Sequence, residues 1–437
     1  MSGAADKARF HLEQSVPELR EWERRDIFSK DEITSIARKR SDFEHTIATR
    51  GASSPSTYAR YIAYELNLST LACKRVVRRR LKSTSSHSSQ KRMFSILDRG
   101  TRKHHGSLEL WMQYLSYCRT QGARKRLQRV LTECVRMFPT KPEVWIWAAR
   151  YEMDIKGDVG AARGWMQRGL RFCPRRTELW IEYGRLEMEF VAKIAARRRI
   201  LGLGKAEADP TMELDSGHLD VDDDEEMDAD EIALPAVSAE EFETQDGGER
   251  KRGSGLDQVA LEKLSKSPAL NGAIPKAIFD ASMKQFAPAS PSTASRTDGA
   301  WRIIDQTAAD FFHMFAEFAA PASAPCAGML LQHVLDNTPV SQDVERGVQM
   351  ASCMCRHPVA IVEFDAPDFP SALRESLKRI KQARTLDMEK EQKQNLDLAL
   401  SSWLTPMLEE NRLAPELKLV LKTTLAILDH GESNASQ

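Results

Sequence analysis

Three short tryptophan-containing segments recur along the first half of the chain at nearly constant intervals. Trp111 and Trp145 are 34 residues apart, and Trp145 and Trp180 are 35 residues apart. Each tryptophan follows an acidic and an aliphatic residue, in ELW, EVW and ELW. A period of this length is typical of paired helices that stack as a solenoid. The sequence therefore predicts an all-α repeat fold.

The residues that follow each aromatic ring predict one helix face. Trp180 is followed at offsets of three and seven by Tyr183 and Glu187, and Tyr58 begins a weaker, earlier copy. Residues at these offsets share one side of a helix. Rings spaced this way favour core packing over base stacking, because their burial stabilises each helix pair. We assign repeat packing to Tyr58, Tyr61, Glu65, Trp111, Tyr114, Trp145, Glu152, Trp180, Tyr183 and Glu187.

Helix boundaries can also be predicted from local signals. Ser29–Glu32 and Thr140–Glu143 match the capping-box pattern at a helix start, and Gly122 and Gly157 mark turns. Helical patterns resume near Ile274 and continue through 301–318, 326–336, 341–355, 369–386, 390–408 and 415–428. The segment 359–364, VAIVEF, is the only short strand candidate.

The net charge is zero overall, but the two halves of the chain differ strongly. Residues 1–200 hold 41 Lys and Arg against 22 Asp and Glu. Residues 206–249 contain 18 acidic side chains and no Lys or Arg, which predicts a disordered acidic insert. We therefore expect N-terminal helices at 1–55, a repeat array at 56–203, an acidic linker at 204–270 and a second helical array at 271–432.

The repeated face resembles the half-a-TPR (HAT) repeat, in which Trp-x-x-Tyr-x-x-x-Glu marks the first helix and a proline closes the second. Trp180, Tyr183 and Glu187 match all three positions of this pattern. The stretch LREWERRDIFSKDEITSIARKRSDFEHTIATRG, residues 19–51, resembles the opening of the U-three small nucleolar RNA-associated protein six family. The segment GAIPKAIFDAS, residues 272–282, is similar to a later helical part of that family.

The resemblance implies a function, partners and a location. Members of that family are non-enzymatic scaffold subunits of the UtpB complex in the small-subunit processome, which processes precursor ribosomal RNA in the nucleolus. The implied partners are other processome subunits, with precursor rRNA and the U-three snoRNP nearby. The repeat pattern alone leaves open a HAT scaffold of splicing or of RNA 3′-end formation.

Basic clusters mark candidate contacts with phosphates or with acidic partner proteins. Residues 51–150 hold 20 Lys and Arg against 5 Asp and Glu, an imbalance that a solvated helix face does not require. Neutralising phosphates would make RNA binding salt-dependent, without reading sequence. Acidic partners explain the same charge. The candidates are Arg78, Arg79, Arg80, Arg124, Lys125, Arg126, Arg175, Arg176, Arg197 and Arg198.

No arrangement of residues in the sequence predicts catalysis, a cofactor or a small-molecule substrate. No Gly-rich phosphate loop follows a strand pattern, and Gly-x-Ser-x-Gly is absent. Cys353 and Cys355 lack a second cysteine pair, so we expect no metal site. The seven scattered cysteines indicate reduced thiols inside a cell, and neither a signal peptide nor a membrane span is expected.

Overall fold

The computed structural model describes residues 4–49, 51, 53–81, 87–200, 271–287, 298–319, 324–338, 347–363, 366–385, 390–409 and 414–433. The predicted acidic linker, 204–270, lies outside these residues. Within them the regular secondary structure is entirely helical, which confirms the all-α prediction. The chain divides into two compact units, Met1–Leu179 and Trp180–Gln437. The four predicted domain ranges stay a prediction.

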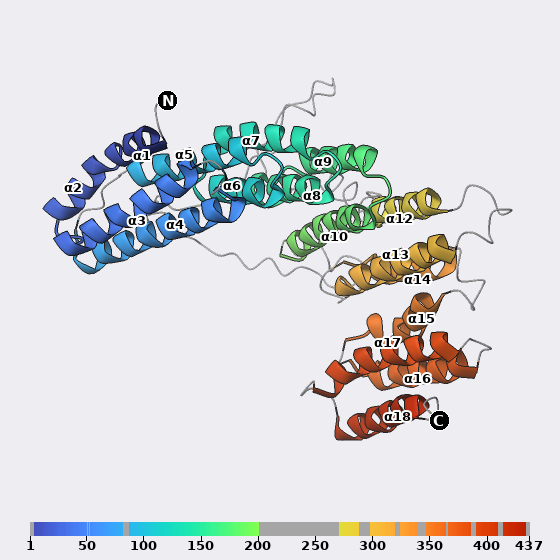
Figure 1. Cartoon of the computed structure of the whole chain (residues 1–437). Helices are drawn as coiled ribbons and strands as arrows, with labels where there is room; N and C mark the ends of the chain where they lie inside the picture. Colours follow the sequence, from blue (N-terminus) through green and yellow to red (C-terminus); the bar gives the residue numbers. More distant parts are fainter. Residues whose placement is uncertain are drawn as a thin grey trace, which may run out of the picture. The chain divides into compact units, whose positions relative to one another are not determined.

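The first unit consists of consecutive helices joined by short turns. They are α1 (Ala4–Glu13), α2 (Val16–Arg24), α3 (Lys30–Ala48), α4 (Pro55–Arg78), α5 (His87–Lys103), α6 (Leu108–Thr120), α7 (Arg124–Met137), α8 (Pro142–Tyr151), a π-helical turn (Glu152–Lys156), α9 (Val159–Phe172) and the start of α10 (Thr177–Ile200). Three hairpins follow from the packing of α4 on α5, α6 on α7, and α8 on α9. In Figure 1, α5, α7 and α9 follow one another along one side of this unit, and α4, α6 and α8 along the other.

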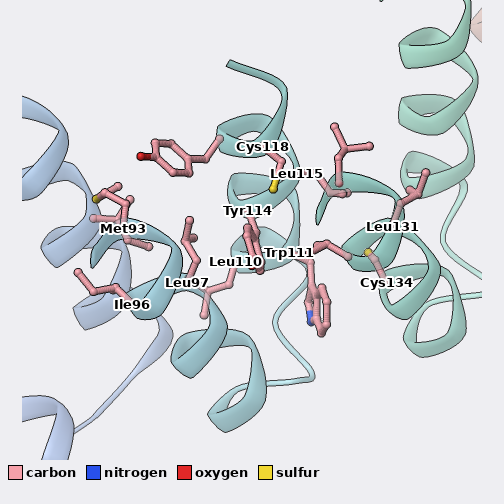
Figure 2. Close-up of a cluster of buried hydrophobic side chains, with 14 of the residues drawn as sticks. Met93, Ile96, Leu97, Leu110, Trp111, Tyr114, Leu115, Cys118, Leu131 and Cys134 are labelled. Atoms are coloured by element: carbon pink, nitrogen blue, oxygen red, sulfur yellow. The ribbon is translucent and has the colours of Figure 1, made fainter. Parts of the chain in front are cut away.

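The core of the first unit runs through successive hairpins. Figure 2 shows Trp111 and Tyr114 of α6 between side chains of α5, such as Leu97, and side chains of α7, such as Leu131. The buried cluster extends from Ile47 to Tyr151. Each helix therefore packs on both the preceding and the following helix, as a stacked repeat requires.

Local signals set most of the helix boundaries. At Ser29, the hydroxyl accepts from the Glu32 amide at 3.2 Å and the Glu32 carboxylate accepts from the Ser29 amide at 3.0 Å, which confirms that capping box. Gly122 and Gly157 have φ of +64° and +70°, the left-handed conformation expected at these turns. The predicted capping box at Thr140 is wrong.

That error has a simple geometric cause. Pro142 opens α8, so the cap position falls on Lys141, whose side chain makes no capping hydrogen bond. Thr140 lies one residue too early for its hydroxyl to reach the free amides of the first turn. The helix itself begins at the predicted place, because proline is well suited to the first turn.

The second unit contains the rest of α10 and seven further described helices. They are α12 (Ala273–Phe286), α13 (Asp298–Glu317), α14 (Ala327–Asn337), α15 (Val348–Ala360), α16 (Phe369–Thr385), α17 (Lys390–Glu409) and α18 (Pro415–Ser433). Helix α15 packs on α16 and α17, and α17 packs on α18, around a core that includes Phe369 and Leu400. The strand candidate at 359–364 is not a strand over its described residues, since Val359 and Ala360 complete α15 and 361–363 follow it without strand structure.

Candidate binding surface of the N-terminal unit

The aromatic rings of the repeat lie in the interior of the first unit. Tyr58, Tyr61, Tyr114 and Trp145 are at most 2% exposed, and Trp111 is 5% exposed. The phenol of Tyr114 donates to the carboxylate of Asp98 on the preceding helix. Burial, together with this hydrogen bond to Asp98, raises the pKa of Tyr114 and keeps it a donor.

Trp111 and Trp145 each make a hydrogen bond that the repeat pattern does not predict. The indole nitrogen of Trp111 donates to the carbonyl of His105 at 3.1 Å, and that of Trp145 to the carbonyl of Pro139 at 2.9 Å. Each acceptor lies six residues before its tryptophan, in the turn that leads into the helix. Each indole thus fixes the turn between two hairpins as well as filling the core. Because the acceptor lies six residues before the tryptophan in both cases, the constant length of this turn was the signal present in the sequence.

The glutamate of the earliest copy, Glu65, belongs to a buried ionic network. Arg40 donates from Nε and Nη2 to the two oxygens of Glu65 at 2.7 and 2.9 Å, and its Nη2 lies 3.5 Å from Glu18. Arg92 donates to Glu18 at 2.5 Å and to Glu65 at 3.3 Å. The network joins α2, α3, α4 and α5, and Arg40 is only 1% exposed. Burial lowers the pKa of Arg92, but the charges of Glu18 and Glu65 outweigh burial and leave it raised.

Two further ion pairs connect α3 to its neighbours. Glu44 accepts two hydrogen bonds from Arg99 of α5, at 2.7 and 2.8 Å. Glu32 accepts two from Arg75 of α4, also at 2.7 and 2.8 Å. The Arg75 hydrogen bonds, and then the Ser29 amide, lower the pKa of Glu32 to about 2. Helix α3 is therefore linked by bidentate pairs to both helices of the first hairpin.

The other predicted packing residues lie in the π-helical turn and in the second unit. Glu152 is 7% exposed and its carboxylate lies 2.8 Å from Lys156, within the π-helical turn. In the second unit, Tyr183 and Glu187 are buried and Trp180 is half-buried. The repeat-packing role of all ten residues stays a prediction.

The predicted basic residues lie at several separate helix ends. Arg78, Arg79 and Arg80 are exposed where α4 ends, and Arg79 donates to Asp26 at 3.0 Å. Arg175 and Arg176 are exposed in the turn before α10, and Arg197 is exposed near its end. The side chain of Arg198 lies outside the described residues. These contacts stay predictions.

The basic cluster at Arg124, Lys125 and Arg126 borders a surface of which the sequence predicted only some residues. Arg124 and Lys125 are exposed at the start of α7, but Arg126 packs over the ring of Phe94 at 4.3 Å, 3.6 Å from Asp98. Two hollows flank Asp98, with volumes of about 460 and 320 Å³. Both are lined by α5 and α7, and the smaller one is also lined by His11 of α1.

Arginines that we did not single out line these hollows. Arg102 borders both of them, and Arg129 and Arg136 border the larger one. A helical signal was present, because Lys91, Asp98 and Arg102 recur at intervals of seven and four on α5. Arg126, Arg129, Glu133 and Arg136 recur at three, four and three on α7. That these two faces meet depends on tertiary packing.

A comparison with known protein families gives a match that includes the buried ionic network. The model of the family "U3 small nucleolar RNA-associated protein 6" matches residues 12–99, which run from the end of α1 through most of α5. The resemblance predicted from the sequence is confirmed. Every member of the buried network, Glu18, Arg40, Glu65 and Arg92, lies within the matched residues.

Proteins named for that family are similar over a longer stretch. The U3 small nucleolar RNA-associated protein 6 of Schizosaccharomyces pombe is 33% identical over 243 residues, which cover 54% of this chain and 49% of that protein. The homologues of Mus musculus and Homo sapiens are 30% and 31% identical over 164 residues, which cover 37% of this chain and 27% of each homologue. The chain thus spans about half of the fission-yeast relative and about a quarter of the mammalian ones.

Two other features of the described residues are the polarity of the helices and the state of the cysteines. None of the described helices is long and apolar enough to span a membrane. The seven cysteines are free thiols, and six of them are buried. Burial raises the pKa of Cys353 to about 12 and that of Cys355 to about 11, so these neighbouring thiols stay protonated at neutral pH. A protonated thiol is a poor nucleophile and a poor metal ligand.

Proposed function

We propose that this protein is a non-enzymatic scaffold subunit of the small-subunit processome, within the UtpB complex. In that role it supports precursor rRNA processing and assembly of the small ribosomal subunit in the nucleolus. The match of residues 12–99 to the U3 small nucleolar RNA-associated family carries the proposal. Stacked hairpins with long exposed helix faces support it, because such arrays bind segments of other proteins.

The charge of the first unit supports a place beside RNA. Its exposed arginines at the ends of α4 and α7 would attract a polyanion at long range without reading sequence. In this proposal precursor rRNA and the U3 snoRNP are neighbours, and other processome subunits are the bound partners. No cofactor, metal or small-molecule substrate takes part.

Depletion of the protein from cells of its own species tests the proposal. We expect mature small-subunit rRNA to fall and unprocessed precursors to accumulate, while large-subunit rRNA is maintained. Re-expression of the wild-type chain should restore processing. Unchanged levels of small-subunit rRNA after complete depletion would contradict the proposal.

The repeat also leaves a second candidate function, a HAT scaffold of splicing or RNA 3′-end formation. Purification of the tagged full chain, followed by mass spectrometry, separates the two candidates. Processome subunits should dominate the bound proteins if the first proposal is correct. Spliceosomal or cleavage-factor proteins in their place would favour the alternative.

A further inference from the structure

We propose that the surface between α5 and α7 binds an extended acidic peptide of a partner protein. We call the two adjoining hollows around Asp98 the α5–α7 groove. Its basic lining comes mainly from Lys91, Arg102, Arg126, Arg129 and Arg136. The inference rests on the proposed scaffold role and deepens it by naming a surface and the chemistry of its occupant.

Several cations of the groove are available to a ligand. Lys91, Arg102 and Arg136 are exposed, and none of them pairs with a carboxylate among the described residues. Arg102 borders both hollows, so it can contact a ligand that crosses from one to the other. A ligand with several negative charges along an extended chain would pair with these side chains in turn.

Two other arginines of the groove are held in place before any ligand binds. Asp98 lies 3.6 Å from Arg126 and 4.0 Å from Arg129, and it also accepts the phenol hydrogen of Tyr114. The guanidinium of Arg126 lies 4.3 Å from the centre of the Phe94 ring. Asp98 is thus a positioning residue, fixed from the core side by Tyr114. Side chains ordered in advance lose less entropy when a ligand binds.

The remaining lining favours a peptide over a nucleic acid backbone. Asp98 and Glu133 place two carboxylates in the larger hollow, so its positive surface is interrupted and suits a ligand with a few spaced negative charges better than a phosphate at every unit of the chain. The same hollow is lined by Trp111 and by Met137, which is 45% exposed, so it offers an apolar contact beside the charges. A peptide with several spaced acidic side chains and one apolar side chain fits both features.

Binding of labelled peptides to the purified full chain tests this inference. The probe is a fluorescein-labelled dodecapeptide of alternating Glu and Ser with one central Leu, measured by fluorescence anisotropy at low salt. Its counterparts are the same peptide with Lys in place of Glu, and single-stranded oligouridine RNA of equal length. The double variant Arg102→Glu/Arg136→Glu reverses the groove, and Arg60→Glu/Arg119→Glu makes the same charge change at exposed sites outside it.

The acidic peptide should bind the wild-type chain and the control variant alike. The groove variant should weaken it by about tenfold or more and should gain affinity for the lysine peptide. Equal effects of the two variants, or no binding of the acidic peptide at millimolar concentration, would overturn the inference. Tighter binding of the RNA, lost in the groove variant alone, would assign the groove to nucleic acid instead. The binding test uses the purified chain without other processome components. It can therefore fail while the depletion test succeeds, and it can succeed while the depletion test fails.

Discussion

The first unit is held together in two different ways along its length. The region of α2 to α5 contains charged side chains in its interior, with Arg40 and Glu65 each 1% exposed and joined by two short hydrogen bonds. The hairpins from α6 to α9 bury the indole rings of Trp111 and Trp145 instead. There Gly169 lies so close to Trp145 that an added Cβ would be 3.0 Å from the indole.

Apolar packing and buried ion pairs fix the arrangement of the helices in different ways. Apolar packing is non-directional and tolerates related arrangements, whereas a bidentate arginine–carboxylate pair fixes distance and orientation together. The irregular N-terminal helices lack the 34-residue period, so the ionic network supplies the specificity that the repeat supplies further on. The predictions below test this contrast.

Removal of Arg40 should have the largest effect. Arg40→Met leaves two buried carboxylates, Glu18 and Glu65, to share the single guanidinium of Arg92, and we expect a loss of about 3–5 kcal/mol in the free energy of unfolding. Arg38→Met, at an exposed position of the same helix, should change it by less than about 0.5 kcal/mol. Urea denaturation followed by circular dichroism measures both. Similar effects from the two variants would mean that the network does not stabilise this region.

In the hairpins, replacing the tryptophan that donates a hydrogen bond from the core should destabilise more than replacing one that does not. Trp145→Phe leaves the Pro139 carbonyl with only the weak thiol donor of Cys173, at 3.4 Å, and we expect a loss of about 1–3 kcal/mol. Trp147→Phe is the matched control, since Trp147 is half-buried, stacks on Tyr151 at 5.6 Å and donates to no acceptor in the described part of the chain. The same denaturation assay applies. A smaller effect at 145 than at 147 would contradict the role of the indole nitrogen.

Two glycines of α9 should respond in opposite directions to the same substitution. Gly164→Ala should stabilise by up to about 1 kcal/mol, because its Cβ would meet nothing closer than Arg168 at 3.8 Å. Gly169→Ala should destabilise by about 1–2 kcal/mol, because its Cβ would clash with Trp145 and Leu179. Thermal melting of the two variants compares them. A gain of stability at 169 would show that the hairpin packs less closely than described.

The smallest expected effect is a pH dependence at the Glu32–Arg75 pair. The pKa of Glu32 is lowered from 4.5 to about 2, so its contribution is present above pH 4.5 and is lost as the pH falls toward 2. The difference in the free energy of unfolding between the wild type and Arg75→Met should therefore become smaller as the pH falls from 4.5 toward 2. The exposed Arg9–Glu13 pair of α1 provides the control, through Arg9→Met. A difference that is constant from pH 6 to 3 would contradict this assignment.

The sequence predicted the features that depend on local spacing. The tryptophan period predicted the hairpins around Trp111 and Trp145, and Ser29 and Gly122 were correct because caps and turns depend on a few neighbouring residues. The Thr140 prediction failed because Pro142 shifted the cap position by one residue. Such signals locate a helix end only to within a residue or two.

Features that depend on distant residues could not be predicted in this way. Glu65 was placed on the packing face, but its partner Arg40 is 25 residues away on another helix. Arg102 and Arg136 come from different hairpins and share a hollow only after these stack. Periodicity shows which face of a helix a charge lies on, but not which other face it meets.

We propose that this helical array acts as a scaffold in U3-associated particles. Immunoprecipitation of the tagged full chain, with quantification of co-purified RNA, tests it most directly. We expect strong enrichment of U3 snoRNA and small-subunit precursor rRNA over spliceosomal small nuclear RNAs. Equal recovery of both kinds of RNA, or enrichment of the spliceosomal RNAs, would contradict it.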